Sequence, residues 1–381
     1  MSPLLPLLLR LQIPFNLGVN LQKALFSDAT EWKDVPLPAD GCEAASLRPL
    51  FRDGCLACRG AAMTTPAIPQ RLQHIVSEAQ CYPPLPVAVV DAQEAHVLAG
   101  VIEASDSRLI EPLLVGPRAS IERVCRRLDC PADRFPILDT PPASQAAEQG
   151  VQLVLEGKVE ALVKGWIHTD ELMRPVLREL RTGRRISHVF VADLPSYHKL
   201  LFITDAAINI APDLTIKAEI LQNAIELARI LGVAKPKVAA LSAVELVKPT
   251  IPSTLDAACL SKMAQRGQIA HAEVDGPLAF DNAISRDAAR VKRINSPVAG
   301  DVDIVLAPDL DAGNILAKDL EYLAGAVLAG IVIGARVPLM LTSRSDPPAA
   351  RLLSAGIAVL LRHRWEGEMS MASRIDEGED A

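Results

Sequence analysis

Short apolar runs alternate with amphipathic stretches along the chain from residue 63 onward. Residues 215–231 repeat apolar side chains at helical spacing, which predicts a helix that ends at Gly232. The same pattern predicts helices at 93–103, 120–128 (with Ser120 as its N-cap), 151–156, 169–180, 253–266 and 349–361. The apolar runs predict strands at 86–90, 113–115, 135–138, 160–163, 186–192, 199–203, 237–241, 272–274, 303–306 and 338–341.

Strands that alternate with helices in this way are typical of βαβ units and a mostly parallel sheet. Such sheets bind ligands in the loops at the carboxyl ends of their strands. The chain contains no Gly-x-Gly-x-x-Gly fingerprint and no Gly-x-x-x-x-Gly-Lys-Ser/Thr loop. The sequence therefore predicts an α/β enzyme that is neither a dinucleotide-binding protein of that fingerprint nor a P-loop enzyme.

The most apolar segment of the chain lies at 323–337 and contains three glycines. We interpret it as a buried helix that runs into a loop. No stretch reaches about 18 uninterrupted apolar residues, so we expect no membrane-spanning segment. Residues 4–11 are apolar, but no basic residue precedes them, and we therefore do not interpret them as a secretory signal.

Composition narrows the class of function. The chain is 50% hydrophobic and only 3% aromatic, with a net charge of −7 and an isoelectric point of about 5.6. An acidic chain poor in aromatic residues does not favour nucleic-acid binding. The seven cysteines are an odd number scattered along the chain, which is not a disulfide framework. Cys55 and Cys58 form a CxxC pair without a second pair, so we expect no metal site there.

The two ends of the chain differ from the middle. Residues 1–62 show no sustained helical or strand period, and their acidic and basic side chains balance. We expect this segment to be a disordered extension or translated upstream sequence, with the true start at Met63. Residues 371–381 are acidic, and we expect them to be a flexible tail.

Four loop segments each combine small, turn-forming and polar residues next to an apolar run. They lie at 163–169, 295–300, 308–314 and 341–346. Backbone amides at the start of a helix can receive an anion, and arginine can bind phosphate with two parallel hydrogen bonds. From these segments and the helix that follows the first one, we select as candidate site residues Lys164, His168, Thr169, Arg174, Asn295, Ser296, Gly300, Asp309, Gly313, Asn314, Ser343, Arg344 and Asp346.

Each candidate also has a purely structural interpretation. The segments 295–300 and 308–314 have ordinary loop compositions. Ser343 and Asp346 could cap the helix that follows Pro347. His168 could be a hydrogen-bonding residue, and Lys164 and Arg174 could be solvated. His188 and His198 have no ligand-like partner four residues away, so neither predicts a metal site.

Together, and in this order, the segments resemble the phosphate acetyltransferase/phosphate butyryltransferase family. The resemblance extends from about residue 75 to about residue 362. The matching stretches are LVKGWIHTDELMRPVL (162–177), ITDAAINIAPD (203–213), VDGPLAFDNAI (274–284), NSPVAGDVDIVLAPDLDAGNILAK (295–318) and PLMLTSRSD (338–346). Ser343-Arg344 followed by Ser-Asp is closest to the butyryltransferase-like branch.

The resemblance implies the reaction acyl-CoA + phosphate = acyl phosphate + CoA. It implies two three-layer α/β/α domains of the isocitrate/isopropylmalate dehydrogenase type with the active site in a cleft between them. We place the first domain at 63–184 plus 337–370 and the second at 185–336. It further implies a cytoplasmic homodimer coupled to an acetate or butyrate kinase, with coenzyme A as substrate and no permanently bound cofactor or metal.

Carried over by position, Arg174 and Arg344 match arginines that hold phosphate, and Ser343 matches a serine that supports the transition state. A gapless match places Ala350 at the family's catalytic aspartate, so we assign that role to Asp346. CoA must become a thiolate before it attacks an acyl phosphate, which requires a base. Two alternatives stay open: an NAD- and metal-dependent dehydrogenase of the same fold, and a non-catalytic acyl-CoA-binding member.

Overall fold

The computed structural model describes residues 69–131, 133–140, 143–342 and 346–376, with side chains described to Trp365. By its internal contacts the chain divides into Met1–Met63 and Thr64–Ala381. The predictions for 1–62, for the end of the acidic tail, and for Ser343 and Arg344 fall outside the described residues. Among the described helices, none is long and apolar enough to cross a membrane.

In the described part of the chain, eleven strands form one sheet in the order β3-β2-β1-β4-β11-β10-β5-β6-β9-β7-β8. The strands are β1 (Leu85–Val90), β2 (Ile110–Gly116), β3 (Ile137–Asp139), β4 (Ala161–Lys164), β5 (Ser187–Asp193), β6 (Leu201–Thr204), β7 (Lys237–Leu241), β8 (Glu273–Leu278), β9 (Ile304–Leu306), β10 (Val327–Ile333) and β11 (Leu339–Met340). Most neighbouring pairs are parallel, so the prediction of an α/β fold with a mostly parallel sheet is confirmed.

Helices occupy most of the connections between strands, as the amphipathic pattern predicts. The helices are α4 (Gln70–Ala79), α5 (Ala95–Asp106), α6 (Arg118–Arg127), α7 (Ala143–Leu155), α8 (Thr169–Glu179), α9 (Leu214–Ile230), α10 (Pro252–Gln265), α11 (Phe280–Ile284), α12 (Arg286–Val291), α13 (Leu310–Tyr322) and α14 (Pro348–Asp376).

Two parallel blocks, β3-β2-β1-β4-β11 and β6-β9-β7-β8, run in opposite directions on either side of β10 and β5. Their carboxyl ends nevertheless meet. The pairing of the strands aligns one residue from each of β4, β11, β10, β5, β6 and β9 in a single row across the sheet. These residues are Val163, Met340, Ile331, Val189, Thr204 and Leu306. Strands β11, β6 and β9 end in this row, and β4 ends one residue beyond it. The loops that leave both blocks therefore begin at the middle of the sheet.

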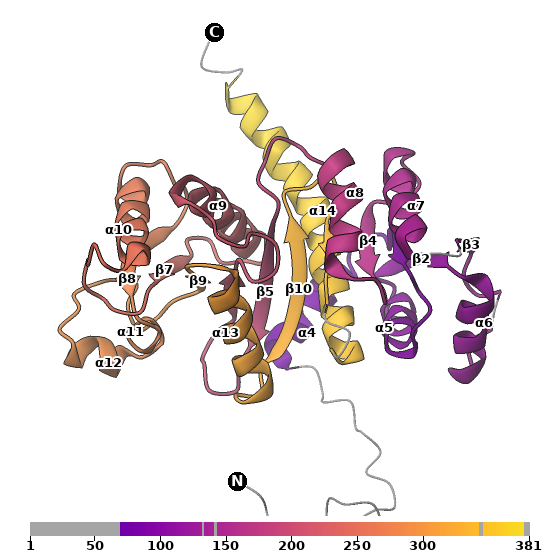
Figure 1. Ribbon diagram of the computed structural model, residues 1–381, viewed down its shortest axis with the longest axis horizontal. Helices are drawn as coiled ribbons and strands as arrows, with labels where there is room; N and C mark the ends of the chain where they lie inside the picture. Colours follow the sequence, from indigo (N-terminus) through magenta and orange to yellow (C-terminus); the bar gives the residue numbers. More distant parts are fainter. Residues whose placement is uncertain (1–68, 132, 141–142, 343–345, 377–381) are drawn as a thin grey trace, which may run out of the picture. The chain divides into compact units, whose positions relative to one another are not determined.

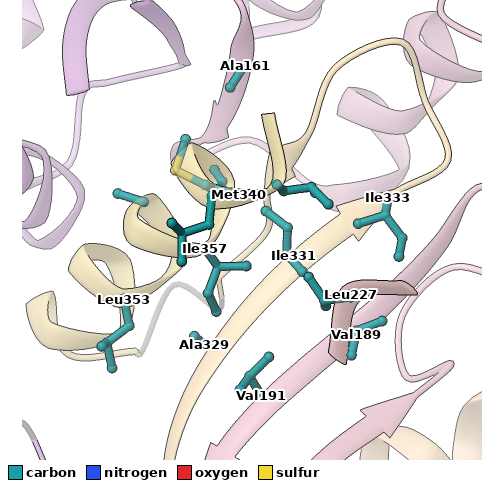
Figure 2. Packing of buried hydrophobic residues seen from close by; sticks show 14 of the residues in the cluster. Ala161, Val189, Val191, Leu227, Ala329, Ile331, Ile333, Met340, Leu353 and Ile357 are labelled. Carbon is teal, nitrogen blue, oxygen red and sulfur yellow. The ribbon is translucent and has the colours of Figure 1, made fainter. Parts of the chain in front are cut away.

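The two faces of the sheet are packed differently. On one face, side chains from both blocks and from β10 and β5 join a single hydrophobic core with α14, which lies along β10 (Figure 1). Figure 2 shows part of this core, with Leu353 and Ile357 of α14, Ile331 of β10 and Val189 of β5 among its members. On the other face the apolar residues form two separate cores, one including α7 and α8 residues and the other α13 residues.

Strand alternation determines which residues face the gap between those two cores. The apolar residues of this row belong to the core on the α14 face. Successive side chains of a strand point to opposite faces, so the neighbours of the row residues on each strand point to the other face. His188 of β5 and Lys164, the last residue of β4, are two of these residues, and Leu341 and Asp205 directly follow the ends of β11 and β6. The polar residues at these positions therefore gather on the face that lacks a continuous apolar core.

Two local predictions are wrong. The segment 323–337 contains the strand β10 rather than a buried helix. A central strand that is buried on both faces has a continuous apolar sequence, which periodicity alone cannot distinguish from a buried helix. Helix α6 begins at Arg118 with Pro117 at its N-cap position, so Ser120 lies inside the helix and is not its cap. Proline's fixed φ suits the start of a helix, and here that preference places the boundary.

Candidate functional site

Four buried or half-buried ionisable side chains form what we call the central polar cluster: His188, Asp205, Lys318 and Asp346. His188 belongs to β5, and Asp205 directly follows β6. Lys318 belongs to α13, and Asp346 lies two residues before the start of α14. His188, Asp205 and Asp346 are each at most 3% exposed. A buried charge is costly unless other groups compensate it, so this concentration marks a functional candidate.

Asp346 is the candidate residue that the structure places in this cluster. Its Oδ1 lies 3.6 Å from Nζ of Lys318. The chain enters this region from β11 through Leu341 and Thr342, both buried. Asp346 thus holds a carboxylate at the carboxyl end of β11, as expected for a ligand-binding edge of a parallel sheet.

Lys318 connects Asp346 to α13. Its Nζ donates to Oε2 of Glu321 at 2.8 Å. Burial acts to lower the pKa of Lys318, but the hydrogen bond to Glu321 and the charge of Asp346 outweigh it, so the pKa is raised. Lys318 therefore keeps its positive charge beside the Asp346 carboxylate across the physiological range.

The candidates on α13 hold this helix in position. Asp309 is the N-cap, and its Oδ1 accepts from the Ala312 amide at 2.8 Å. A Cβ on Gly313 would lie 2.3 Å from the Asp205 carbonyl oxygen, so only glycine permits this approach. Asn314 donates from Nδ2 to the Ala206 carbonyl at 3.0 Å. These contacts fix α13, and with it Lys318, against the loop that follows β6.

Asp205 organises that loop. Its Oδ1 accepts from the amides of Ala207 and Ile208 at 2.9 and 3.0 Å. Its Oδ2 accepts from Nδ2 of Asn209 at 2.6 Å. A carboxylate that receives this many hydrogen bonds is stabilised where it is buried. Asp205 is therefore a structural anchor at the base of the cluster.

His188 is the second residue of β5 and is fully buried. Among the described residues, neither ring nitrogen has a hydrogen-bond partner of good geometry, although the Leu341 carbonyl lies nearby. Burial lowers the pKa of His188 despite the negative charges of Asp205 and Asp346, so the ring is neutral at physiological pH. The absence of a side chain on Gly330 makes room for it, since a Cβ there would lie 3.0 Å from Nε2.

Arg351 of α14 contacts the start of the fourth candidate segment, 341–346, from the face of the sheet that α14 covers. Its Nη1 donates to Oγ1 of Thr342 at 2.8 Å. Burial lowers the pKa of Arg351, while the charges of Asp346 and Glu94 act to raise it. A Cβ on Gly100 of α5 would lie 2.6 Å from the Arg351 side chain, so that glycine opens the path for it.

The first candidate segment joins β4 to α8. Lys164, the last residue of β4, is buried and lies level with Leu341, which leads to Asp346. His168 is exposed at the N-cap position of α8 without a capping side-chain hydrogen bond, and Thr169 begins the helix. Arg174 is 73% exposed, and its Nη2 lies 3.8 Å from Asp170. The structure therefore brings Lys164 near the central polar cluster and leaves the Arg174 side chain in solvent.

The second candidate segment lies elsewhere. Ser296 accepts from the Val298 and Ala299 amides, which forms a turn, and Asn295 is exposed. Gly300 has a positive φ, and a Cβ there would lie 2.5 Å from Arg286. This segment leads into the amino end of β9, whereas the central polar cluster lies at the carboxyl ends of β6 and β9. The structure does not bring these three residues to the cluster.

Asp301, directly after that segment, is the centre of a separate charge network. Lys237 and His198 contact its two carboxylate oxygens at 2.7 and 2.8 Å, and Lys199 lies 3.3 Å away. Burial acts to raise the pKa of Asp301, but the hydrogen bonds from Lys237 and His198 and the charge of Lys199 lower it far more. The network ties together the amino ends of β6, β7 and β9.

Replacing Asp301 with asparagine is expected to lower the free energy of unfolding by about 2 kcal/mol near neutral pH. Because folding lowers the pKa of Asp301, its contribution is present above the unfolded aspartate pKa of about 3.9 and is lost as the pH falls below it. Urea unfolding should therefore show a smaller difference between variant and wild type at about pH 3 than at about pH 7. Asp287→Asn, at an exposed ion pair, should change little at either pH.

Metal-ligating side chains do not gather in groups of three or more anywhere in the part of the chain that the structure describes. The central polar cluster offers carboxylates, a lysine and a neutral histidine, which suit proton transfer and anion binding. Sequence reasoning missed Asp205, Lys318, Arg351 and the position of His188. The available signals were a histidine inside an apolar strand and the membership of Asp205 and Lys318 in two of the matching stretches, 203–213 and 295–318.

Comparison with known proteins identifies the family. A family model described as phosphate acetyl/butaryl transferase matches residues 140–357. A phosphate acetyltransferase of Rhizobium meliloti is 50% identical over 302 residues, which cover 78% of this chain and 96% of that protein. A phosphate butyryltransferase of Clostridium acetobutylicum is 40% identical over 278 residues, covering 72% and 92%.

A solved structure agrees with the sequence comparisons. The crystal structure of a branched-chain phosphotransacylase from Enterococcus faecalis V583 matches with a TM-score of 0.64 and 31% identity, covering 73% of this chain and 99% of that one. The fold and the sequence relatives lead to the same assignment, and they confirm the resemblance seen in the sequence. The chain belongs to the phosphate acetyl/butaryl transferase family.

Proposed function

We propose that this chain is an acyltransferase that catalyses acyl-CoA + phosphate = acyl phosphate + CoA. Membership in the family supports the reaction. The observation that carries the proposal is the buried Asp346 carboxylate beside Lys318, two residues after the pair Ser343-Arg344 in the sequence. A carboxylate, a hydroxyl and a guanidinium in one short segment are the groups that this reaction requires.

In the proposed mechanism, Asp346 accepts the proton of the CoA thiol as the sulfur attacks the carbonyl carbon of the acyl phosphate. The carbonyl oxygen gains negative charge, and the Ser343 hydroxyl donates a hydrogen bond to it. Phosphate then departs with the electron pair of the broken C–O bond, held by Arg344 and Arg174. Both substrates bind together, so no covalent enzyme intermediate forms.

The surrounding candidates are proposed to position the substrates. Lys164 adds positive charge at the end of β4, and His168 and Thr169 present the first amides of α8 to an anion. Asp309, Gly313 and Asn314 act through α13, which carries Lys318. Asn295, Ser296 and Gly300 lie apart from the other candidates, before the amino end of β9, where the Ser296 hydroxyl accepts from the Val298 amide. Coenzyme A is a substrate in this scheme and not a resident cofactor.

Phosphate-dependent release of CoA from acetyl-CoA tests the proposal. The purified chain should release CoA when phosphate or arsenate is added, in the presence of a chelator and without NAD. A rate that required NAD and a divalent metal would instead indicate a dehydrogenase of the same fold. Binding of acyl-CoA without turnover would indicate a non-catalytic member, and either result would refute the proposal.

The acyl group is proposed to be short, acetyl or butyryl. Relatives named for each of these groups are found, at 50% and 40% identity. One methylene changes binding by only about 1–3 kcal/mol, so we expect turnover of acetyl-, propionyl- and butyryl-CoA with a preference of about ten- to hundredfold. Assaying kcat/KM for the three thioesters side by side identifies the preferred group, and a rate restricted to long chains would contradict the proposal.

Lys318→Met is expected to lower kcat by about tenfold or more, because Asp346 loses the partner that orients its carboxylate. The KM for CoA should change little, since Lys318 acts through Asp346. Lys262→Met, which removes an exposed lysine of α10, is the matched control. An equal loss in both variants, or a rise in KM without a fall in kcat, would show that Lys318 does not position Asp346.

The setting of the enzyme is also part of the proposal. The resemblance of the chain to the family supports a cytoplasmic homodimer with two α/β domains at 63–184 plus 337–370 and at 185–336. The acyl phosphate product is a phosphoryl donor, and a kinase specific for acetate or butyrate is the enzyme class that would consume it.

A further inference from the structure

A cavity of about 530 Å³ lies at the opposite end of β11 from the central polar cluster. Its apolar wall is formed by Ile333, Val337, Pro338, Leu361 and Trp365. These residues belong to the end of β10, to the turn that leads into β11, and to α14. The volume is in the range of pockets that hold ligands of drug size, and apolar and aromatic linings are typical of them.

Three arginines, Arg184, Arg336 and Arg362, also line the cavity. The Arg184 guanidinium lies over the Trp365 ring at 4.5 Å and contacts Glu226 at 2.6 Å. Arg362 pairs with Glu160 at 3.0 Å. For Arg336, which is exposed, the described residues provide no ion pair. The cavity therefore presents an excess of positive charge at the edge of an apolar wall.

Hydrogen bonds and close backbone packing hold one wall of the cavity in place. The turn between β10 and β11 is attached to the segment before β5 by the hydrogen bond from Thr182 to the Gly334 carbonyl at 2.9 Å. The Arg336 amide donates to the Leu180 carbonyl at 2.9 Å. Gly334 has a positive φ, and a Cβ there would lie 2.0 Å from the Arg185 carbonyl oxygen. A preformed cavity binds without the cost of ordering its walls.

We propose that this cavity is a second ligand site, for an organic anion with an apolar body of more than one ring or branch. The apolar wall receives the body, and Arg336 receives the carboxylate, sulfonate or phosphate head. An acetyl or butyryl group alone would leave most of the volume empty. The site is separate from the residues of acyl transfer, because residues 333–338 precede β11 and Thr342 and Asp346 follow it. It does not depend on the proposed function.

Titration with 8-anilinonaphthalene-1-sulfonate, which has two aromatic rings and one anionic head, tests the site. We expect saturable binding of one dye molecule per folded chain, with energy transfer from tryptophan that Trp365→Phe reduces. The neutral analogue N-phenyl-1-naphthylamine should bind more weakly. Arg336→Glu should weaken binding of the sulfonate at least tenfold and leave the neutral dye unaffected. Arg123→Glu, at an exposed position of α6, should leave both unaffected.

Circular dichroism and the urea midpoint confirm that each variant is folded, which excludes dye binding to a loosened core. Non-saturable binding, or equal affinities for Arg336→Glu and Arg123→Glu, would overturn the proposal. So would displacement of the dye by CoA, which would place it at the acyl-transfer site. Binding that appears only when the protein is diluted would show that a second copy of the chain covers the cavity, and this also would overturn it.

Discussion

Asp346→Asn is expected to lower kcat for acylation of CoA by about 10³-fold near neutral pH. Asparagine has nearly the shape of aspartate but cannot accept the thiol proton, so the loss falls on the chemical step. The KM values for CoA and acyl phosphate should change by much less. Steady-state rates with both substrates varied separate the two effects.

Asp319→Asn is the matched control for this variant, because Asp319 is an exposed carboxylate on α13, the helix that carries Lys318. It should retain wild-type rates. Asp346→Asn also removes the charge facing Lys318, so the urea midpoint of both variants must be measured. If Asp346→Asn is folded and turns over at more than about a tenth of the wild-type rate, Asp346 is not the base.

Arg344→Ala is expected to reduce the rate of acyl transfer by about 10³-fold while the fold survives. The variant lacks the guanidinium that neutralises the departing phosphate through two parallel hydrogen bonds. The loss should appear in kcat and in the KM for phosphate in the reverse direction. Arg344→Lys should recover only part of the rate, because lysine keeps the charge but cannot form two parallel hydrogen bonds.

Arg123→Ala, which truncates an exposed arginine of α6, is the control for that experiment. Near-normal turnover by Arg344→Ala would refute its assignment as a phosphate-binding residue. A uniform loss in both variants would instead point to an effect on stability, which thermal unfolding of the two proteins would reveal.

Much of the fold follows from local pattern. The helix expected at 215–231 is found as α9, and the strand expected at 186–192 is found as β5. These segments have strong periodicity or a compact apolar run, so their local preference agrees with their place in the fold. The segment 323–337 contains a strand where its pattern predicts a helix, because burial on both faces of β10 removes the alternation that identifies a strand.

The candidate site shows a different limit. Asp346 could be selected from its place after an apolar run and beside Ser343-Arg344. The partnership with Lys318 could not, because it depends on the strand order that brings β11 and β6 to one row of the sheet. The sequence offers His188 no metal-ligand partner, and its place in the cluster depends on its position near the start of β5, beside the ends of β11 and β6.

Arg174 and the segment 295–300 show that a matching motif does not by itself place a side chain. Arg174 occupies an exposed turn of α8 and contacts Asp170. Ser296 and Gly300 satisfy a turn near the Asp301 network. The sequence shows which strand each of these residues precedes or follows. The direction of that strand in the sheet decides at which end of the sheet the residue lies.

The dependence of the Asp346→Asn defect on pH tests the central claim most directly. A thiol has a pKa of about 8.5, so solvent supplies the thiolate of CoA as the pH rises. If Asp346 is the base, the ratio of wild-type to variant kcat, measured at saturating CoA and acyl phosphate from about pH 6 to about pH 9, should shrink by at least tenfold. A ratio that stays constant over this range would contradict the account, because it would show that Asp346 supports the structure of the site and does not remove the proton.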